Sequence, residues 1–480
     1  MLSTKKVNGR VYTPNYIVLN ILDLCDYSGI GILGKHIIDN SCGDGAFLVE
    51  VVRRYCEIAQ SHNVSDSQIT LDLGKFIHGI EIDFDECQKC RQNLSEVADC
   101  FGIKSVNWDV NCADTLTVKK YDGKMDFVVG NPPYVRVHNL LDNYTDVKQF
   151  SFAQNGMTDL YIVFYEIGLN MLNSTGTLGY ISPSSLFNSV AAATMRKNII
   201  CNNNLKKVVD LKHFQPFEAT TYTTIMILTK EANPFIDYYE YDQNNFEPFV
   251  VSRLNYENFV MNDSFVFGQK DVLERLQEMV LYAKCSTAYI VKNGFATLYD
   301  DFFIGNWDFD DYTIPIIKAS TGVVKKCIFP YDSFGNLVPF DGLIKIPTIR
   351  EHYYAHIDRL KKRSLEKDSH WYAFGRSQGI NDVYKRKYAI NTLIRDVNDI
   401  KLQVAASGTG VYSGLYILTD LGFDELQQTL FSDDFVSYVS ILGKYKSGGY
   451  YTYSSKDLSR YLNYKFVERS GYNYGQFAIS

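Results

Sequence analysis

The tetrapeptide Asn-Pro-Pro-Tyr at residues 131–134 directly follows an apolar run at residues 125–130. The run is typical of a buried parallel strand, and the two prolines stop the strand and stiffen its exit. Open α/β sheets bind ligands at this end of their strands. The Asn131 side chain and the Pro132 backbone offer two carbonyls for the hydrogens of an amino group, and Tyr134 can stack on the ring that carries it. Taken alone, the tetrapeptide could also be a plain turn.

Three earlier strands are expected to end at residues that suit an adenosine. The first enters a turn with Gly43 and Gly45 ahead of a helix, and glycines there let the backbone approach a ligand. The second reaches Glu81, whose carboxylate can accept both ribose hydroxyls, and the third leads to Asp114, which can accept from an adenine amine. The expected strands are residues 36–39, 76–83 and 106–110. Each feature has a simpler structural explanation, but their order predicts a nucleoside site.

A Tyr-Thr-Pro element at residues 12–14 precedes these strands. A helix is expected to follow it, with Pro14 at the first helical position and Thr13 as the N-cap. In this order the elements resemble the TaqI-type DNA adenine-N6 methyltransferases, in the γ arrangement of that class. One departure is Asn40, which stands where many relatives have proline. Asparagine costs little there, so the departure puts no role in doubt.

The resemblance implies S-adenosylmethionine as cofactor and an α/β fold with a seven-stranded Rossmann-like methyltransferase sheet. Strands at residues 176–183, 205–211 and 225–229 complete that sheet, and a surface insertion is expected near residues 61–75. The implied cofactor-binding residues are Tyr12, Thr13, Asp39, Ser41, Gly43, Gly45, Glu81, Ile82, Asp114 and Asn131. The implied catalytic residues are Asn131, Pro132, Pro133, Tyr134 and Phe217.

The implied reaction is methyl transfer to N6 of an adenine that has been flipped out of double-stranded DNA. Asn131 and the Pro132 carbonyl would hold the amine, while Tyr134 and Phe217 would stack on the extruded base. The resemblance further implies a site-specific enzyme of a restriction-modification or epigenetic system. A cognate restriction endonuclease is then an expected partner.

Strand and helix cease to alternate after residue 234, so we expect a catalytic domain at residues 1–234 and an α+β DNA target-recognition domain at residues 235–480. Residues 350–401 carry 12 Lys and Arg against 7 Asp and Glu, with aromatic residues interleaved. Cationic side chains neutralise phosphates, and aromatic rings pack on sugars or bases. The candidate DNA-binding residues are Lys361, Lys362, Arg363, Trp371, Arg376, Lys385 and Lys387. For residues 357–365, a solvated charged helix is an equal alternative.

Composition bounds these expectations without deciding them. Hydrophobic residues make up 46% of the 480 residues and charged residues 21%, as in ordinary globular proteins. The net charge of −7 does not by itself indicate nucleic-acid binding, yet a basic cleft can lie on an acidic protein. The ten cysteines are scattered, and the Cys87–Cys90 pair lacks a second pair at zinc spacing. Without a signal-like or membrane-length apolar run, we expect a cytoplasmic, nucleoid-associated monomer with reduced thiols and no membrane partner.

Three alternatives stay open. The same acceptors could hold another planar amine, such as cytosine N4, guanine N2 of RNA or a protein glutamine, although the Tyr-Thr-Pro element and the long aromatic C-terminal half favour DNA adenine. A fused restriction-modification enzyme would need a nuclease motif, and no convincing acid-rich one is found. A DNA-binding module without activity would have no use for acceptors at each strand end.

Overall fold

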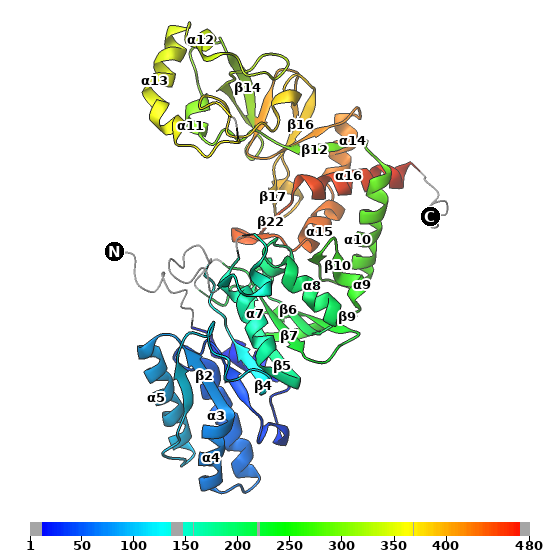
Figure 1. The fold of residues 1–480 in the computed structure, drawn as a ribbon. Coiled ribbons are helices and arrows are strands. Elements are labelled where there is room, and N and C mark those ends of the chain that lie inside the picture. Colours follow the sequence, from blue (N-terminus) through cyan, green and yellow to red (C-terminus); the bar gives the residue numbers. More distant parts are fainter. Residues whose placement is uncertain (1–11, 136–146, 157, 218–220, 368, 471–480) are drawn as a thin grey trace. The chain divides into compact units, whose positions relative to one another are not determined.

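The structure is a computed structural model that describes residues 12–135, 147–156, 158–217, 221–367 and 369–470 (Figure 1). The chain forms two compact units, Met1–Glu274 and Arg275–Ser480. The boundary expected between residues 234 and 235 therefore falls inside the first unit, because two strands beyond residue 234 join its sheet. Residues 218–220, directly after the candidate Phe217, lie outside the described residues.

The first unit is built on a nine-stranded mixed sheet with the order β3-β2-β1-β4-β5-β7-β6-β8-β9. Its strands are β1 (Ile37–Asp39), β2 (Ile77–Glu81), β3 (Asp109–Cys112), β4 (Met125–Gly130), β5 (Leu172–Pro183), β6 (Leu205–Asp210), β7 (Thr223–Thr229), β8 (Ile236–Asp242) and β9 (Glu247–Leu254). Neighbours from β3 to β5 are parallel, whereas β7 runs antiparallel to β5 and β6. The seven expected strands are all present. β8 and β9 extend the sheet beyond the expected edge.

One expected strand is displaced along the chain. β3 begins at Asp109, whereas the sequence pattern places that strand at residues 106–110. The Trp108 indole donates a hydrogen bond to Ser95 Oγ on α5 (Phe84–Cys100) at 2.9 Å, so the segment before β3 turns toward that helix. The expected insertion near residues 61–75 contains a helix, α4 (Asp66–Phe76), which Ser65 caps through the backbone N–H of Gln68.

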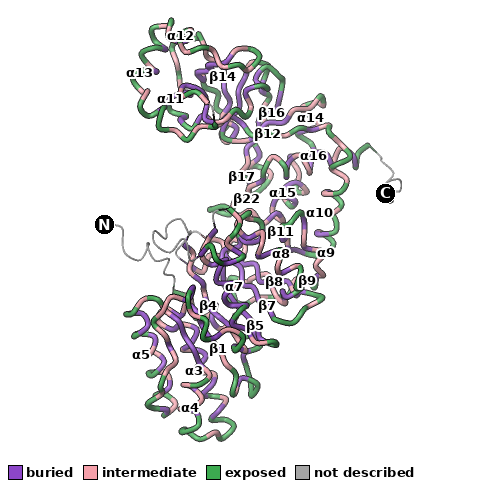
Figure 2. The backbone as a smooth tube through the Cα atoms, in the orientation of Figure 1, coloured by how far each residue is buried: buried purple, intermediate pink, exposed green. Residues whose placement is uncertain are grey.

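Helices cover the sheet of the first unit. They are α2 (Asn15–Leu24), α3 (Ala46–Ser61), α4, α5, α7 (Leu160–Met171), α8 (Ala193–Asn202) and α9 (Tyr256–Phe259). The apolar faces of α2, α3 and α5 share one core with alternate residues of the strands, such as Ile225 and Ile227 of β7. Figure 2 shows buried residues concentrated along these strands. A short hairpin of β10 (Val260–Met261) and β11 (Ser264–Phe265) also belongs to this unit.

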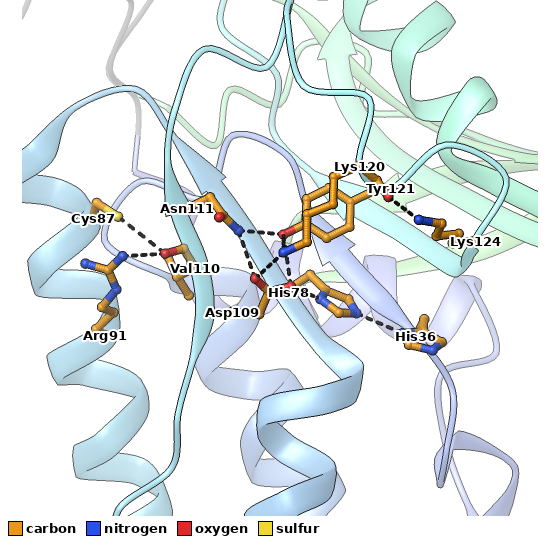
Figure 3. A network of polar contacts seen from close by, with 10 residues as sticks. All are labelled: His36, His78, Cys87, Arg91, Asp109, Val110, Asn111, Lys120, Tyr121 and Lys124. Atoms are coloured by element: carbon orange, nitrogen blue, oxygen red, sulfur yellow. Dashed lines mark hydrogen bonds and ion pairs between the residues drawn. The ribbon is translucent and has the colours of Figure 1, made fainter.

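A polar network ties three strands together at their amino ends (Figure 3). Nδ1 of His36, just before β1, lies 2.8 Å from Nε2 of His78 in β2. Nδ1 of His78 lies 2.7 Å from Oδ2 of Asp109 at the start of β3. Asp109 also accepts from Lys120 at 2.7 Å and from the Tyr121 hydroxyl at 3.0 Å. Burial alone would raise the pKa of Asp109, but the hydrogen bonds from His78 and Lys120 hold it well below its usual range. The network fixes the strand spacing at the edge opposite the expected site.

The second unit contains three sheets with the strand orders β12-β20-β16-β18, β13-β15-β14-β19 and β17-β22-β21. Its strands are β12 (Ile290–Asn293), β13 (Ile304–Gly305), β14 (Thr313–Lys318), β15 (Val323–Ile328), β16 (Lys387–Ile390), β17 (Leu393–Ile394), β18 (Leu402–Ala405), β19 (Gly410–Tyr412), β20 (Leu415–Leu418), β21 (Tyr445–Lys446) and β22 (Tyr450–Thr452). Its helices are α11 (Asp300–Phe303), α12 (Phe340–Leu343), α13 (Pro347–Lys361), α14 (Phe423–Leu430), α15 (Asp433–Ile441) and α16 (Ser455–Arg469). The helix α10 (Lys270–Tyr282) carries the boundary between the units. Pairing between the named strands of the second unit, within the described residues, is antiparallel except between β14 and β19. Among helices in the described ranges, none is both long and apolar enough to cross a bilayer.

Candidate active site

Asn131 follows β4 at the carboxyl edge of the parallel strands and is held by the chain on two sides. Its side-chain Nδ2 donates to Thr13 Oγ1 at 3.2 Å. Its backbone carbonyl accepts from Ser41 Oγ, in the turn after β1, at 3.4 Å. The remaining polar atom of the carboxamide, Oδ1, is buried and has no hydrogen-bond partner among the described residues. A buried acceptor without a donor costs about 1–3 kcal/mol, so this oxygen is ready to accept a hydrogen from a ligand.

Aromatic rings surround the end of the tetrapeptide. The Tyr134 ring meets Phe217 edge to face, with centroids 6.4 Å apart, and meets Tyr161 of α7 in the same way at 6.2 Å. The Tyr134 hydroxyl donates to the Ile181 carbonyl of β5 at 3.3 Å, and burial raises the pKa of Tyr134 well above its ordinary value. The phenol is therefore an anchored neutral ring. The structure brings Phe217 next to Tyr134, and the resemblance implies that these two rings stack on the base.

The turn between β1 and α3 depends on its two glycines for different reasons. Both have left-handed backbones, with φ of +52° at Gly43 and +97° at Gly45. A Cβ at Gly45 would come within 2.9 Å of the Cys90 sulfur on α5, whereas the space beside Gly43 is open. Gly45 thus allows the turn to pack on a helix, and Gly43 leaves room for a ligand near the backbone.

Glu81 links this turn to the end of β2. Its Oε2 accepts from the Gly43 backbone N–H and its Oε1 from the Asp83 backbone N–H, both at 2.9 Å. Each carboxylate oxygen keeps further acceptor capacity, because a carboxylate has about four lone-pair sites. The two bonds fix the orientation of the carboxylate beside the open space at Gly43, which suits a pair of ribose hydroxyls.

Asp39 is buried beneath the site, with 2% of its surface exposed. Its Oδ1 accepts from the Ser41 backbone N–H at 2.9 Å and lies so close to Gly130 that a Cβ there would come within 2.7 Å. Burial raises the pKa of Asp39 to about 7, against the opposing effect of the Ser41 hydrogen bond and with a further rise from Glu81. Asp39 therefore stabilises the turn through Ser41 and packs against Gly130 at the end of β4.

Asn40 has a role that the sequence analysis missed. It is fully buried, its Oδ1 accepts from the Tyr180 hydroxyl of β5 at 2.8 Å, and its backbone carbonyl accepts from Thr115 Oγ1 at 2.6 Å. Asn40 thus joins the turn after β1 to β5 and to the segment after β3. The available signal was a second polar residue directly after Asp39, at the end of a short strand where burial requires partners.

Three other candidate residues lie around the rim. Ile82 has 65% of its surface exposed, directly after Glu81, and offers an apolar contact to a flat ring. The Asp114 carboxylate accepts from the Leu116 backbone N–H at 3.0 Å. The residue before Asp114, Ala113, donates its backbone N–H to the Glu81 carbonyl at 2.9 Å, which ties this segment to the end of β2. Tyr12 has 52% of its surface exposed, and its hydroxyl lies 3.4 Å from Glu86 of α5. The strand ends and the Tyr-Thr-Pro element thus meet at one edge.

The candidate DNA-binding residues of the second unit separate into two groups. Arg363 donates to the backbone carbonyls of Leu360, Thr297, Trp371 and Ala373. Lys387 is 2% exposed and donates to three backbone carbonyls, and burial lowers its pKa to about 8. Arg376 is half-buried and donates to the Ser364 and Gly375 carbonyls, whereas Lys385 is exposed but pairs with Asp382 at 2.8 Å. Arg363 and Lys387 therefore hold the fold together, a role that the sequence pattern does not reveal.

The other group faces solvent. Lys361 and Lys362, at the end of α13, are exposed, and the Lys361 ammonium lies 5.6 Å from the centre of the Trp371 ring. The exposed cations together with a half-buried aromatic ring retain the chemistry that suits a phosphate backbone.

Comparison with known proteins shows which proteins the chain is similar to. Residues 51–217, which begin within α3 and include the tetrapeptide, match the family described as Eco57I restriction-modification methylase. This part of the chain resembles the Eco57I methylases. The chain is 26% identical to the type II methyltransferase M.BstVI of Geobacillus stearothermophilus, over 76% of this chain and 74% of that protein. It is 23% identical to the type II restriction enzyme and methyltransferase RM.Eco57I of Escherichia coli, over 94% of this chain but only 56% of that protein.

Solved structures add the fold. The type IIL restriction-modification enzyme MmeI, solved in complex with DNA, superposes with a TM-score of 0.61 at 14% identity and covers 92% of this chain and 63% of its own. At such low identity the likeness concerns the fold alone. The first unit thus has a mixed α/β methyltransferase fold with a large mixed sheet.

Proposed function

We propose that this chain is a site-specific DNA methyltransferase that transfers a methyl group from S-adenosylmethionine to N6 of a flipped adenine in double-stranded DNA. The observation that carries the proposal is the buried Oδ1 of Asn131, which has no partner among the described residues and lies close along the chain to Tyr134 and its contact with Phe217. An acceptor next to an aromatic surface suits a planar ring with an exocyclic amine. The type II methyltransferases among the relatives support the reaction class, and their restriction-modification setting suggests a cognate endonuclease as partner.

The residues at the sheet edge fit the proposed cofactor. Gly43 leaves open space beside the turn, Glu81 presents an oriented carboxylate for ribose, and Ile82 offers an exposed apolar side chain for adenine. Asp114 would accept from the adenine amine. When bound, S-adenosylmethionine supplies a sulfonium methyl that is already activated for transfer.

The chain's own residues would then act on the amine. Its lone pair is delocalised into the ring and is poorly nucleophilic. Asn131 Oδ1 and the Pro132 carbonyl would accept its two hydrogens, draw them out of the ring plane and localise the lone pair. The bond from nitrogen to the methyl group would form as the bond from the methyl group to sulfur breaks, which leaves a neutral thioether, and the nitrogen would then release one hydrogen to solvent as a proton. Orientation and fixed dipoles supply the catalysis in this scheme, and no covalent bond forms between enzyme and substrate.

The identity of the product tests the proposal directly. DNA from cells that express the protein is expected to contain N6-methyladenine at one sequence context, detected by long-read sequencing and by chromatography of digested nucleosides. DNA from cells that express the Asn131→Ala protein is the matched control. The appearance of 4-methylcytosine would keep the amine-holding site but exclude adenine as its base. DNA without either product would contradict the proposal.

We further propose that residues 235–480 choose the DNA sequence and that Lys361 and Lys362 contact the phosphate backbone. Replacing either lysine with alanine is expected to weaken binding to all sequences alike, and the slope of log K against log salt should fall by about one per lost contact. Fluorescence anisotropy over a salt series measures both quantities. Lys325→Ala, at an exposed lysine of β15 outside the basic stretch, is the control and should leave the slope unchanged. An unchanged slope in the Lys361 and Lys362 variants would leave that helix end as a solvated surface.

A further inference from the structure

We infer that Thr13 is a positioning residue for Asn131, which it holds so that Oδ1 stays where the target amine must arrive. This inference rests on the proposed function, because it assigns Asn131 the amine. It goes beyond the expected part of Thr13 in cofactor binding. The contact between Thr13 Oγ1 and Asn131 Nδ2 at 3.2 Å carries it, together with the unpartnered Oδ1 on the same carboxamide.

The hydroxyl of Thr13 does not cap the helix that follows. The sequence pattern assigns Thr13 as the N-cap of that helix, but α2 begins at Asn15 with Pro14 in the N-cap position. No side-chain capping bond is formed at this end, and the Pro14 carbonyl accepts from the Ile17 and Val18 backbone N–H groups. The N-cap assignment of Thr13 is therefore wrong. Its hydroxyl is directed to the loop after β4.

An asparagine carboxamide needs such a contact in order to stay oriented. The terminal torsion of asparagine has a broad energy minimum, so a carboxamide with neither end bonded can rotate. Rotation by half a turn would exchange oxygen for NH₂ and present donors to an amine that itself needs acceptors. Because Oδ1 has no partner among the described residues, the bond from Nδ2 to Thr13 is the side-chain contact that resists this rotation.

Thr13 is itself fixed from both sides. Pro14 enters α2, whose Ile17 and Ile21 are fully buried in the core of the first unit. On the other side, the Tyr12 hydroxyl lies 3.4 Å from Glu86 on α5. The Tyr-Thr-Pro element therefore runs from α5 to the loop after β4, and a threonine anchored in this way can set the position of a neighbouring side chain.

Thr13→Val tests the inference, since valine keeps the shape of threonine but cannot accept a hydrogen bond. Single-turnover methylation at saturating S-adenosylmethionine and DNA is expected to slow about 10-fold, the effect of one lost hydrogen bond of about 1.4 kcal/mol. The melting temperature should stay the same, and the use of saturating S-adenosylmethionine separates this loss from any cofactor contact of Thr13. Thr13→Ser keeps the hydroxyl and is expected to restore most of the rate.

A double-mutant cycle separates positioning from an independent effect. If Thr13 acts through Asn131, Thr13→Val should add nothing to the loss caused by Asn131→Ala. Additive losses would overturn the inference, and so would a Thr13→Val effect that appears only in KM and disappears at saturation. A neutron crystal structure of the Thr13→Val protein gives a readout without activity, because it distinguishes the oxygen from the NH₂ group: the carboxamide of Asn131 is expected to rotate or to occupy more than one orientation. An unchanged carboxamide would again overturn the inference.

The two proposals can fail separately. A fully active Asn131→Ala enzyme would remove the amine-holding role itself. An inactive Asn131→Ala enzyme together with a Thr13→Val enzyme of normal rate would retain the proposed function and remove only the role of Thr13.

Discussion

Replacing Asn131 with alanine is expected to lower the single-turnover rate of methyl transfer by about 10²–10³, the scale for removing one aligned electrostatic partner of a transition state. The loss should fall on the chemical step, because Asn131 Oδ1 is the acceptor that localises the lone pair of the amine. Affinities for S-adenosylmethionine and for DNA should stay unchanged in calorimetry and in anisotropy. The losses in kcat and in kcat/KM should therefore be equal.

The stability of the same variant distinguishes this role from a structural one. In the free protein, Asn131 gives up one hydrogen bond to Thr13 on mutation but also loses a buried acceptor that has no partner. An unsatisfied buried group costs about 1–3 kcal/mol, so the melting temperature should not fall. Asn202→Ala, at an exposed asparagine that ends α8, is the matched control for the loss of one asparagine and should keep full activity. An Asn131→Ala enzyme with full activity would contradict the mechanism.

Most of the seven expected strands could be predicted because each contains a short apolar run that ends at polar or turn-forming residues. β8 and β9 could not, because their burial is uneven, and β9 exposes Phe249 and Val250. A strand that is only partly buried has a weak apolar pattern and is recognised mainly by its pairing. β3 has a weak apolar pattern too, and its start differs from the expected one because the segment before it turns toward α5 through the Trp108 hydrogen bond.

For the candidate site, sequence reasoning identified residue types and strand ends but not partners. The pairing of Asn131 with Thr13 joins residues 118 positions apart, and that of Asn40 with Tyr180 joins residues 140 apart. The positive charge of residues 350–401 likewise predicts a basic surface. It does not reveal that the side chains of Arg363 and Lys387 donate their hydrogen bonds to backbone carbonyls. Whether a cation is free or used internally depends on burial, which chain position alone does not determine.

Replacing Tyr134 or Phe217 should affect a different step from replacing Asn131, because a stacked ring stabilises the extruded base rather than the transition state of methyl transfer. Stacking of one base on an aromatic side chain is worth about 1–3 kcal/mol. In the free protein the two rings meet edge to face, 78° apart, so they do not form a stacked pair. A base that enters beside Tyr134 can therefore stack without separating a stacked pair.

Tyr134→Ala is accordingly expected to weaken trapping of the flipped base by roughly 5–150-fold, the range that corresponds to the loss of one stacking contact. A fluorescent adenine analogue at the target position measures this, since its emission rises when the base leaves the stack. Phe217→Ala should resemble Tyr134→Ala, and Tyr134→Trp should retain most trapping because it keeps a π-face. Tyr134→Phe is the matched control: it loses only the hydrogen bond to the Ile181 carbonyl and should trap the base nearly as well as the wild type. If Tyr134→Phe instead lost as much trapping as Tyr134→Ala, the hydroxyl rather than the ring would hold the site, and the stacking role would be excluded.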